Sequence, residues 1–244
     1  MEHQPSQQEL SDALTCAVLA SQDVKEFLNG VAALAGRELS LSGETAHCAV
    51  TLIRPSGPDV IASSTETAQQ ADELQYALGD GPCLTAATTG KVVEVTDFHT
   101  DQRWPSYFRE AAAHGVGAVL AVPIPLPGQT KCAINLYATE GHAFSDLEIL
   151  TVQRFAAQAS AAVQLAVRIA DMQTRTEDLM TAMTSRTVID IAVGIIMGQS
   201  RCSQEAAFDV LRAASSHRNQ KLRDVAAEVV KSVDSAPVKT HFTH

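Results

Sequence analysis

The sequence predicts an α+β domain with an antiparallel sheet flanked by helices, which a long helix or coiled coil joins to an all-α bundle of three helices. Short alternating or β-branched runs, separated by Gly- and Pro-containing turns, predict the strands. No Pro or Gly occurs between Ser145 and Val193, so one very long helix can form there, with Ser145 as its N-cap. Residues 186–231 contain three apolar runs at helical spacing, which predicts the bundle.

The elements of the α+β domain can be placed along the chain. Apolar residues at helical spacing predict two helices within residues 6–39, with a break near residues 21–23. The predicted strands are residues 45–54, 59–64, 91–95, 116–126 and 131–139, and the further predicted helices are residues 67–78 and 104–114. The first two strands should form a hairpin about a turn at residues 55–58.

Chemically suggestive residues in this domain are more typical of structure than of catalysis. Cys83 follows a Gly-Asp-Gly-Pro loop. It could be a reactive thiol at the start of a helix, but a small buried residue is the commoner case. Trp104, the only tryptophan, more often anchors a loop than stacks on a ligand, and Asp97 is expected to pair with Arg103. No catalytic triad or metal-ligand spacing is present, so we expect no enzyme, no cofactor and no metal.

The segment 40–165 resembles a GAF domain. The matching residues are Gln75-Tyr76-x-x-Gly79-Asp80-Gly81-Pro82-Cys83, Asp97, Arg103-Trp104-Pro105, Gly115-Val116, Val122-Pro123, Asn135-Leu136-Tyr137 and Ala143-Phe144. GAF domains are small-molecule sensors or dimerisation modules. The resemblance therefore implies a candidate pocket for an unknown small molecule at Cys83, Asp97, Trp104 and Asn135. The ligand itself does not carry over, because the motif of cyclic-nucleotide GAF domains is not matched.

Each helix of the predicted bundle has one apolar face. These faces are Ile189, Ala192, Val193 and Ile196, then Ala207, Val210, Leu211 and Ala214, then Leu222, Val225, Ala226, Val229, Val230 and Val233. Ser203 is expected to cap the second helix and Asn219 the third. Gly194 inside the first helix costs about 1 kcal/mol relative to Ala, so its presence indicates a packing or contact reason.

The same stretch resembles the ANTAR domain, a three-helix RNA-binding module of bacterial antiterminators. The matching pattern is Arg186, Ile189, Ala192-x-Gly194-Ile195-Ile196-Met197, then Glu205-Ala206-x-Phe208-x-x-Leu211-Arg212-x-Ala214, then Asn219-x-Lys221-Leu222-x-x-Val225-Ala226. It departs from many family members at Val193, where they carry a Lys. Actinobacterial proteins combine such a domain with a preceding GAF domain.

The resemblance implies RNA contacts on the bundle. The candidate RNA-binding residues are Arg186, Gly194, Met197, Arg212, Ser215, Arg218, Asn219 and Lys221. Charge alone is weaker evidence: residues 185–244 hold 8 Lys/Arg and 6 Asp/Glu, a net of +2, against 10 and 22, a net of −12, in residues 1–184. A solvated helix face explains the same basic cluster without RNA.

The long helix carries a heptad pattern. Leu165, Ile169, Met172, Thr176, Leu179 and Met183 follow one another at steps of four and three, which favours a parallel coiled coil between two copies. The alternative is a helix packed along its own domain. Thr176 interrupts the seam, so the dimer is expected to need the GAF helices as well.

Together these observations predict a GAF sensor or dimerisation domain at residues 1–165, a coiled-coil linker at 166–184, an ANTAR domain at 185–234 and a disordered tail at 235–244. The predicted function is antitermination through paired stem-loops in nascent RNA. One alternative is a GAF dimerisation module whose helical tail binds protein or DNA, and another is a GAF-type enzyme with a reactive cysteine. No secretory signal or membrane span is expected, and five scattered cysteines favour a cytoplasmic protein.

Overall fold

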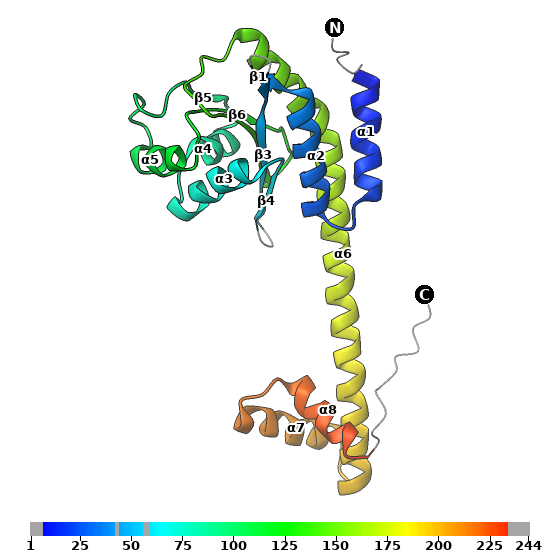
Figure 1. The fold of residues 1–244 in the computed structure, drawn as a ribbon. Helices are drawn as coiled ribbons and strands as arrows, with labels where there is room; N and C mark the ends of the chain where they lie inside the picture. The colour runs from blue at the N-terminus through cyan, green and yellow to red at the C-terminus, as the bar shows by residue number, and fades with distance from the viewer. Residues whose placement is uncertain (1–6, 42–43, 56–58, 234–244) are drawn as a thin grey trace. The chain divides into compact units, whose positions relative to one another are not determined.

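The computed structural model describes residues 7–41, 44–55 and 59–233 (Figure 1). It divides the chain into two compact units, Met1–Ala170 and Asp171–His244. The finer division predicted above, with boundaries after residues 165, 184 and 234, stays a prediction. The tail at 235–244 lies outside the described residues.

A five-stranded antiparallel sheet forms the centre of the first unit, which confirms the predicted α+β class. Its strand order is β4-β3-β7-β6-β5. The strands are β3 (His47–Ile53), β4 (Val60–Ser63), β5 (Val93–Val95), β6 (Ala118–Pro123) and β7 (Lys131–Ala138). The predicted hairpin is β3 with β4, although residues 56–58 of its turn lie outside the described residues. The small β1 (Ser40–Leu41) and β2 (Glu44–Thr45) pair was not predicted from sequence.

Alternating side chains give the sheet two apolar faces, because successive residues of a strand point to opposite sides. On one face Val50 of β3 and Ile134 of β7 belong to a core cluster with α1 (Gln7–Ala20), α2 (Val24–Glu38) and the first part of α6 (Asp146–Ser200). The buried side chains of this part of α6 are Val152, Phe155, Ala156, Ala159, Ala162, Val163, Ala166 and Val167.

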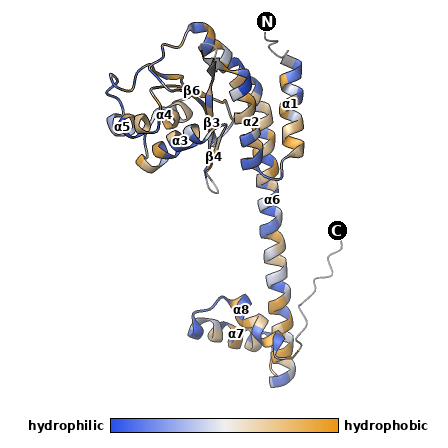
Figure 2. Cartoon of the chain, in the orientation of Figure 1, coloured by the Kyte–Doolittle hydropathy of each residue, from blue (hydrophilic) through white to orange (hydrophobic). Residues whose placement is uncertain are grey.

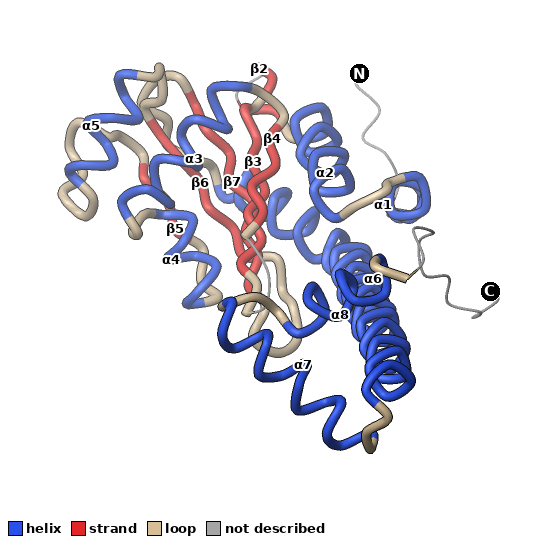
Figure 3. The backbone as a smooth tube through the Cα atoms, turned by 90° about the horizontal axis from the view of Figure 1, so that it is seen from below, coloured by secondary structure: helices blue, strands red, loops and turns tan. Residues whose placement is uncertain are grey.

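Helices α3 (Glu66–Leu78), α4 (Pro82–Thr89) and α5 (Pro105–Ala113) cover the opposite face (Figure 3). Thr65 caps α3 with its side chain, and Gly79 ends it in the left-handed region at φ 71°. Helix α4 was not among the predicted elements, although Pro82 at its first position suits a helix start. The sharp loop predicted at residues 79–82 is thus the connection between two helices.

Helix α6 confirms the long helix predicted from the absence of Pro and Gly. Ser145 and Glu148 form a reciprocal cap: the Ser145 hydroxyl accepts from the Glu148 N–H at 3.3 Å, and the Glu148 carboxylate accepts from the Ser145 N–H at 2.8 Å. Further along α6, the Thr176 hydroxyl donates to the Met172 carbonyl oxygen at 2.8 Å. Hydrophobic and hydrophilic residues are interspersed along the helix (Figure 2).

By length and composition, α6 contains a stretch apolar enough to cross a membrane, which departs from the expectation stated above. One such helix is weak evidence for a membrane span, since helices of soluble cores pass the same test. Only 11% of this apolar stretch is buried, so it is distinct from the part of α6, Val152 to Val167, that packs on the sheet of the first unit.

The second unit contains the end of α6, α7 (Gln204–Arg218) and α8 (Leu222–Lys231), which is the predicted three-helix region. Ser203 caps α7 as predicted, with its hydroxyl accepting from the Ala206 N–H. Val210 and Val233 do not join the core as predicted; they are 56% and 61% exposed.

Candidate nucleic-acid interface

Small side chains let the three helices of the second unit approach closely. Its core is Ala192 and Val193 of α6, Ala207 and Leu211 of α7, and Ala226 and Val230 of α8. Val193, which stands where many ANTAR domains carry Lys, is only 5% exposed and contributes to this core. The bundle thus gains apolar packing at the position where a possible phosphate contact is lost.

The connection between α7 and α8 is a short hydrogen-bonded turn. The Gln220 N–H donates to the Ser215 carbonyl oxygen at 3.1 Å, and the Asn219 N–H to the Ser216 carbonyl oxygen at 3.3 Å. This pattern, with Asn219 left-handed at φ 52°, is a Schellman motif, the common way to end a helix. The Ser215 hydroxyl adds a bond to the Gln220 carbonyl oxygen at 2.6 Å. Ser215 therefore has a structural task in addition to any RNA contact.

The predicted cap of α8 was wrong. Asn219 ends α7, and Lys221 is the N-cap of α8, with no side-chain hydrogen bond to the helix. Arg218 is the last residue of α7 and Lys221 precedes α8, so their side chains do not project from one helix. They lie instead on either side of the turn, next to the α8 N-terminus, whose first N–H groups lack a side-chain cap and favour a negative charge.

Most arginines near this turn already have acidic partners. Arg218 donates to Glu228 of α8 at 2.7 Å, an ion pair across ten residues in which both side chains are about half exposed. Arg212 pairs with Asp209 at 2.9 Å on the same helix. Lys221 differs, because it is exposed and has no ion-pair partner among the residues that the structure describes.

The other candidate residues lie on α6. Arg186, Gly194 and Met197 share one side of that helix, and Arg186 is 3.9 Å from Asp190 in an exposed ion pair. Met197 packs partly against the bundle core. Gly194 is exposed, and a Cβ atom added to it would meet no other atom within 4 Å. The packing reason expected for this glycine is therefore wrong, and the alternative, a contact with a partner, stays a prediction.

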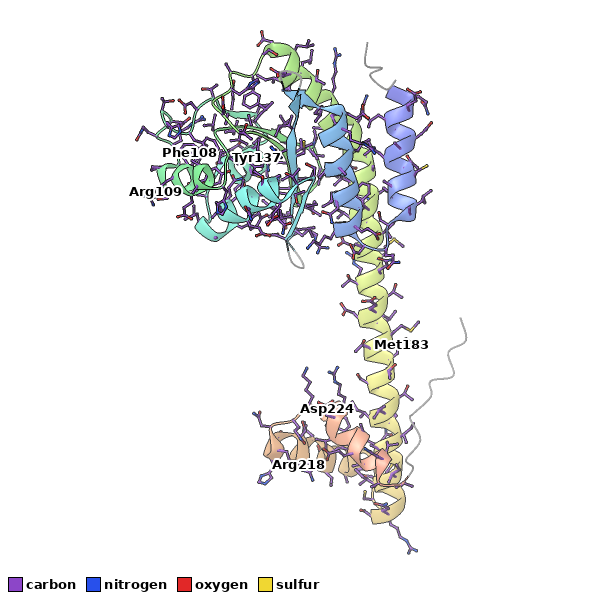
Figure 4. All side chains as sticks on the ribbon, in the orientation of Figure 1. Phe108, Arg109, Tyr137, Met183, Arg218 and Asp224 are labelled. Carbon is purple, nitrogen blue, oxygen red and sulfur yellow. The ribbon has the colours of Figure 1, made fainter. Side chains whose placement is uncertain are left out.

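The structure separates the eight candidates into two groups. Arg212, Ser215, Arg218, Asn219 and Lys221 form the turn group, on α7 and the turn after it (Figure 4 labels Arg218). Arg186, Gly194 and Met197 form the α6 group, and no hydrogen bond or ion pair between described residues joins the groups.

Sequence reasoning missed Phe208 as a functional candidate. This aromatic side chain is 38% exposed on α7, one helical turn before Arg212. An exposed aromatic residue beside arginines suits stacking on an unpaired base. The sequence did contain a signal for this residue, because Phe208 is one of the residues that match the ANTAR pattern.

A groove of about 520 Å³ runs between α6 and α8 in the second unit. Its lining residues are Met180, Thr181, Thr184, Ser185, Val188, Arg223, Asp224 and Ala227. At about 100° per residue, these α6 positions lie roughly 130° around the helix from the heptad residues. The groove therefore stays open if two α6 helices pair through the heptad seam.

The four candidate pocket residues of the first unit also fall into two groups. Cys83 and Asn135 are buried at the same place, around Asp72 of α3. Asp97 instead accepts from the His99 N–H at 2.8 Å, and Trp104 donates from its ring nitrogen to Asp80 at 3.0 Å. Arg103 pairs with Asp101 at 2.6 Å, so the expected pair with Asp97 was wrong.

Asp72 is a fully buried carboxylate that the sequence did not single out. One oxygen accepts from Asn135 at 2.7 Å, Tyr137 at 2.7 Å and Gln75 at 3.1 Å, and the other accepts from the Thr51 hydroxyl. Gln75 also accepts from the Cys83 N–H at 2.7 Å. Figure 4 labels Tyr137 near Phe108 of α5. This Asp72 cluster ties α3 to β3, to β7 and to the start of α4.

Burial governs the protonation of these groups. It raises the pKa of Asp72, and side-chain hydrogen bonds, among them those from Thr51, Tyr137 and Asn135, oppose that shift. It also raises the pKa of the Cys83 thiol well above its ordinary value, with the Asp72 charge adding to the effect. A thiol that is 1% exposed with a raised pKa does not suit a nucleophile, so the enzyme alternative gains no support from Cys83.

Comparison with known proteins agrees with these two units. A GAF domain model matches residues 21–164, and an ANTAR domain model matches residues 177–230. ANTAR domains are RNA-binding antitermination domains, GAF domains are sensory or dimerisation domains, and both are regulatory rather than catalytic in general. No curated protein matches this sequence.

Several solved structures are similar over most of their length. The GAF domain of an Acinetobacter phosphoenolpyruvate-protein phosphotransferase has 12% identity and a TM-score of 0.47, covering 70% of this chain and 99% of its own. A LuxR family transcription factor from Burkholderia cenocepacia, dependent on N-acylhomoserine lactone, has 13% identity, a TM-score of 0.48 and coverages of 67% and 96%. Reduced fRMsr of Staphylococcus aureus has 15% identity, a TM-score of 0.43 and coverages of 67% and 99%.

Proposed function

Given that this chain belongs to the GAF family and carries an ANTAR domain after its GAF domain, we propose that it is a cytoplasmic, homodimeric regulator of transcription antitermination. Its ANTAR domain would bind paired stem-loops in nascent RNA and favour an antiterminator hairpin over a terminator. The GAF domain would sense a small molecule or hold the dimer.

The observation that carries this proposal is the ANTAR match, which spans the end of α6, α7 and α8 and includes the whole turn group. Lys221 is the N-cap of α8 and makes no side-chain cap hydrogen bond, and Arg218 lies three residues before it, an arrangement that suits phosphate. Phe208 and Asn219 offer stacking and hydrogen bonding to bases of an RNA loop, where unpaired bases can be splayed and read.

Two copies would supply two RNA sites. The heptad residues of α6 that are exposed in a single chain support this arrangement, among them Met172 at 67% and Leu179 at 62%. Such apolar positions gain stability by pairing with a second α6 helix. The domain division predicted from sequence fits the same picture, with the linker segment 166–184 holding most of the seam.

The test compares nucleic acids of equal length. Fluorescence anisotropy of the full chain would measure the Kd for a two-hairpin RNA, for its two single hairpins and for a duplex DNA. We expect the two-hairpin RNA to bind most tightly, since linking two sites raises the effective concentration of the second. Equal binding to duplex DNA would favour the alternative of a DNA-binding helical tail, and no binding to either would favour a protein partner.

A further inference from the structure

Glu228 binds the Arg218 guanidinium, which the proposed function needs for contact with RNA phosphate. Arg218 is the last residue of α7, and its guanidinium donates to Glu228 in the middle of α8 at 2.7 Å. A guanidinium bound to a carboxylate has fewer donors free for phosphate, because both anions take the same planar fork. A phosphate must therefore share or replace this partner.

This pair differs from the other arginine contacts of the second unit. Arg212–Asp209 and Arg186–Asp190 join residues three or four apart on one helix, and Arg223–Asp224 joins neighbours in sequence. Only helix packing brings Glu228 to Arg218 among these pairs, since ten residues and the α7–α8 turn separate them. The guanidinium is thereby held at the middle of α8.

The pair is also accessible and weak enough to exchange. The Arg218 and Glu228 side chains are 53% and 55% exposed, so water and ions reach both. Exposed ion pairs contribute little to stability and are screened by salt. Asp224 lies four residues before Glu228 on α8, and its like charge disfavours the Glu228 carboxylate when no cation is near. Lys231 lies three residues after Glu228 and can replace Arg218 as its partner.

Resting on the proposed function, we propose that Glu228 is a built-in competitor of RNA phosphate: it holds and positions Arg218 in the free protein and is displaced when a stem-loop binds. Each productive contact at Arg218 then exchanges a carboxylate for a phosphate. Weak, non-specific polyanions gain less from this exchange than an RNA whose phosphate is held in place by the rest of the turn group. Glu228 is in this sense a specificity-determining residue.

The test is a double-mutant cycle in the full-length protein. The probe is a fluorescein-labelled two-hairpin RNA, enriched by the wild-type protein from a pool with randomised loops, and Kd is measured at low and high KCl. The variants are Glu228→Gln, Arg218→Ala and the double variant. Glu205→Gln is the matched control, because it removes the same charge from an exposed position of α7 that has no ion-pair partner among the described residues.

We expect Glu228→Gln to bind RNA about two- to fivefold more tightly at low salt, the range that an exposed ion pair represents, and to lose this advantage at high salt. In the Arg218→Ala background the same change should have no effect, because its partner is gone. The control should change Kd by less than Glu228→Gln in both backgrounds. Circular dichroism of each variant would verify that the helices are retained.

The outcomes are distinct. Equal tightening in both backgrounds, or tightening by the control to the same degree, would show that only net charge acts and would overturn the role of Glu228. Unchanged or weaker binding by folded Glu228→Gln would overturn it as well. If the pool yields no RNA that the wild-type protein binds, the proposed function fails, and the inference falls with it.

Discussion

Removing the Asp72 carboxylate should destabilise the GAF unit strongly. In Asp72→Ala, four buried groups lose their acceptor: the Thr51 hydroxyl, the Gln75 and Asn135 amides, and the Tyr137 hydroxyl. The Gln75 amide keeps the Tyr137 hydroxyl as an acceptor at 3.1 Å, so three groups are left unsatisfied. At about 1–3 kcal/mol for each buried unsatisfied group, the expected loss is at least about 3 kcal/mol. Native domains are stable by only about 5–15 kcal/mol in total.

Asp72→Asn should be far milder. Its amide oxygen can keep the three bonds made by one carboxylate oxygen, and its NH2 group can donate to the Thr51 hydroxyl. It also removes a buried charge, so we expect a loss below half of that of the alanine variant. Glu73→Ala is the control, because this exposed neighbour on α3 accepts, within the described part of the chain, only from Gln69. The variant should stay within about 0.5 kcal/mol of wild type.

Urea unfolding measured by tryptophan fluorescence would check these values. Trp104 is the only tryptophan, lies in the first unit and packs edge-on against Phe108, so its signal reports on the GAF unit. An Asp72→Ala midpoint equal to that of Glu73→Ala would refute the reasoning, because it would mean that the cluster contributes no net stability.

The raised pKa of Asp72 predicts how the stability of the GAF unit depends on pH. Its folded pKa is raised, so the folded protein binds more protons than the unfolded chain between the two pKa values, and stability falls as pH rises. The contribution of Asp72 is complete below the unfolded value of about 3.9 and is lost as pH rises through the folded pKa. The free energy of unfolding of wild type minus that of Asp72→Asn should therefore decrease as pH rises through that window. A difference that stays constant with pH would contradict the raised pKa.

Three further changes test the second unit and the proposed dimer. Leu179→Asp with Met183→Asp should weaken the dimer in analytical ultracentrifugation, because charges in an apolar seam cost several kcal/mol, and an unchanged dimer would place the interface elsewhere. Gly194→Ala should raise the thermal stability of the second unit by about 0.5–1 kcal/mol, because its Cβ meets open space, and a lower melting temperature would disprove that. Arg218→Ala with Lys221→Ala should weaken RNA binding at least about tenfold and lower the salt slope by about 0.7–0.9 per lost contact, with unchanged circular dichroism; unchanged affinity would make both residues solvated charges.

Much of the fold was predictable because it depends on local patterns. The absence of Pro and Gly between Ser145 and Val193 predicted most of α6, which continues past Gly194 and Gly198 to Ser200. Ser203 was recognisable as a cap from its position before an apolar run. The ends of α7 and α8 were harder. Asn219 is compatible with an N-cap and with a left-handed helix end, and only the geometry of the turn decides between them.

Contacts between distant residues could not be predicted in the same way. Asp72 meets Asn135 only because β3 and β7 pair with Ala49 opposite Asn135, which places the amide on the face that α3 covers. Glu228 reaches Arg218 only through the packing of α7 on α8. Both the buried network and the arginine partners depend on strand register and helix packing, which one sequence does not reveal.

The hydrogen bond from Thr176 to the Met172 carbonyl oxygen has a consequence for how two chains would exchange partners. A hydroxyl already bonded to its own helix can lie between two helices without an unmade hydrogen bond, so this threonine is tolerated within the seam. It contributes less apolar contact than Met172 or Leu179 on either side. We expect such a weak layer to let mixed dimers form on mixing two differently labelled preparations, and Thr176→Leu to slow that subunit exchange.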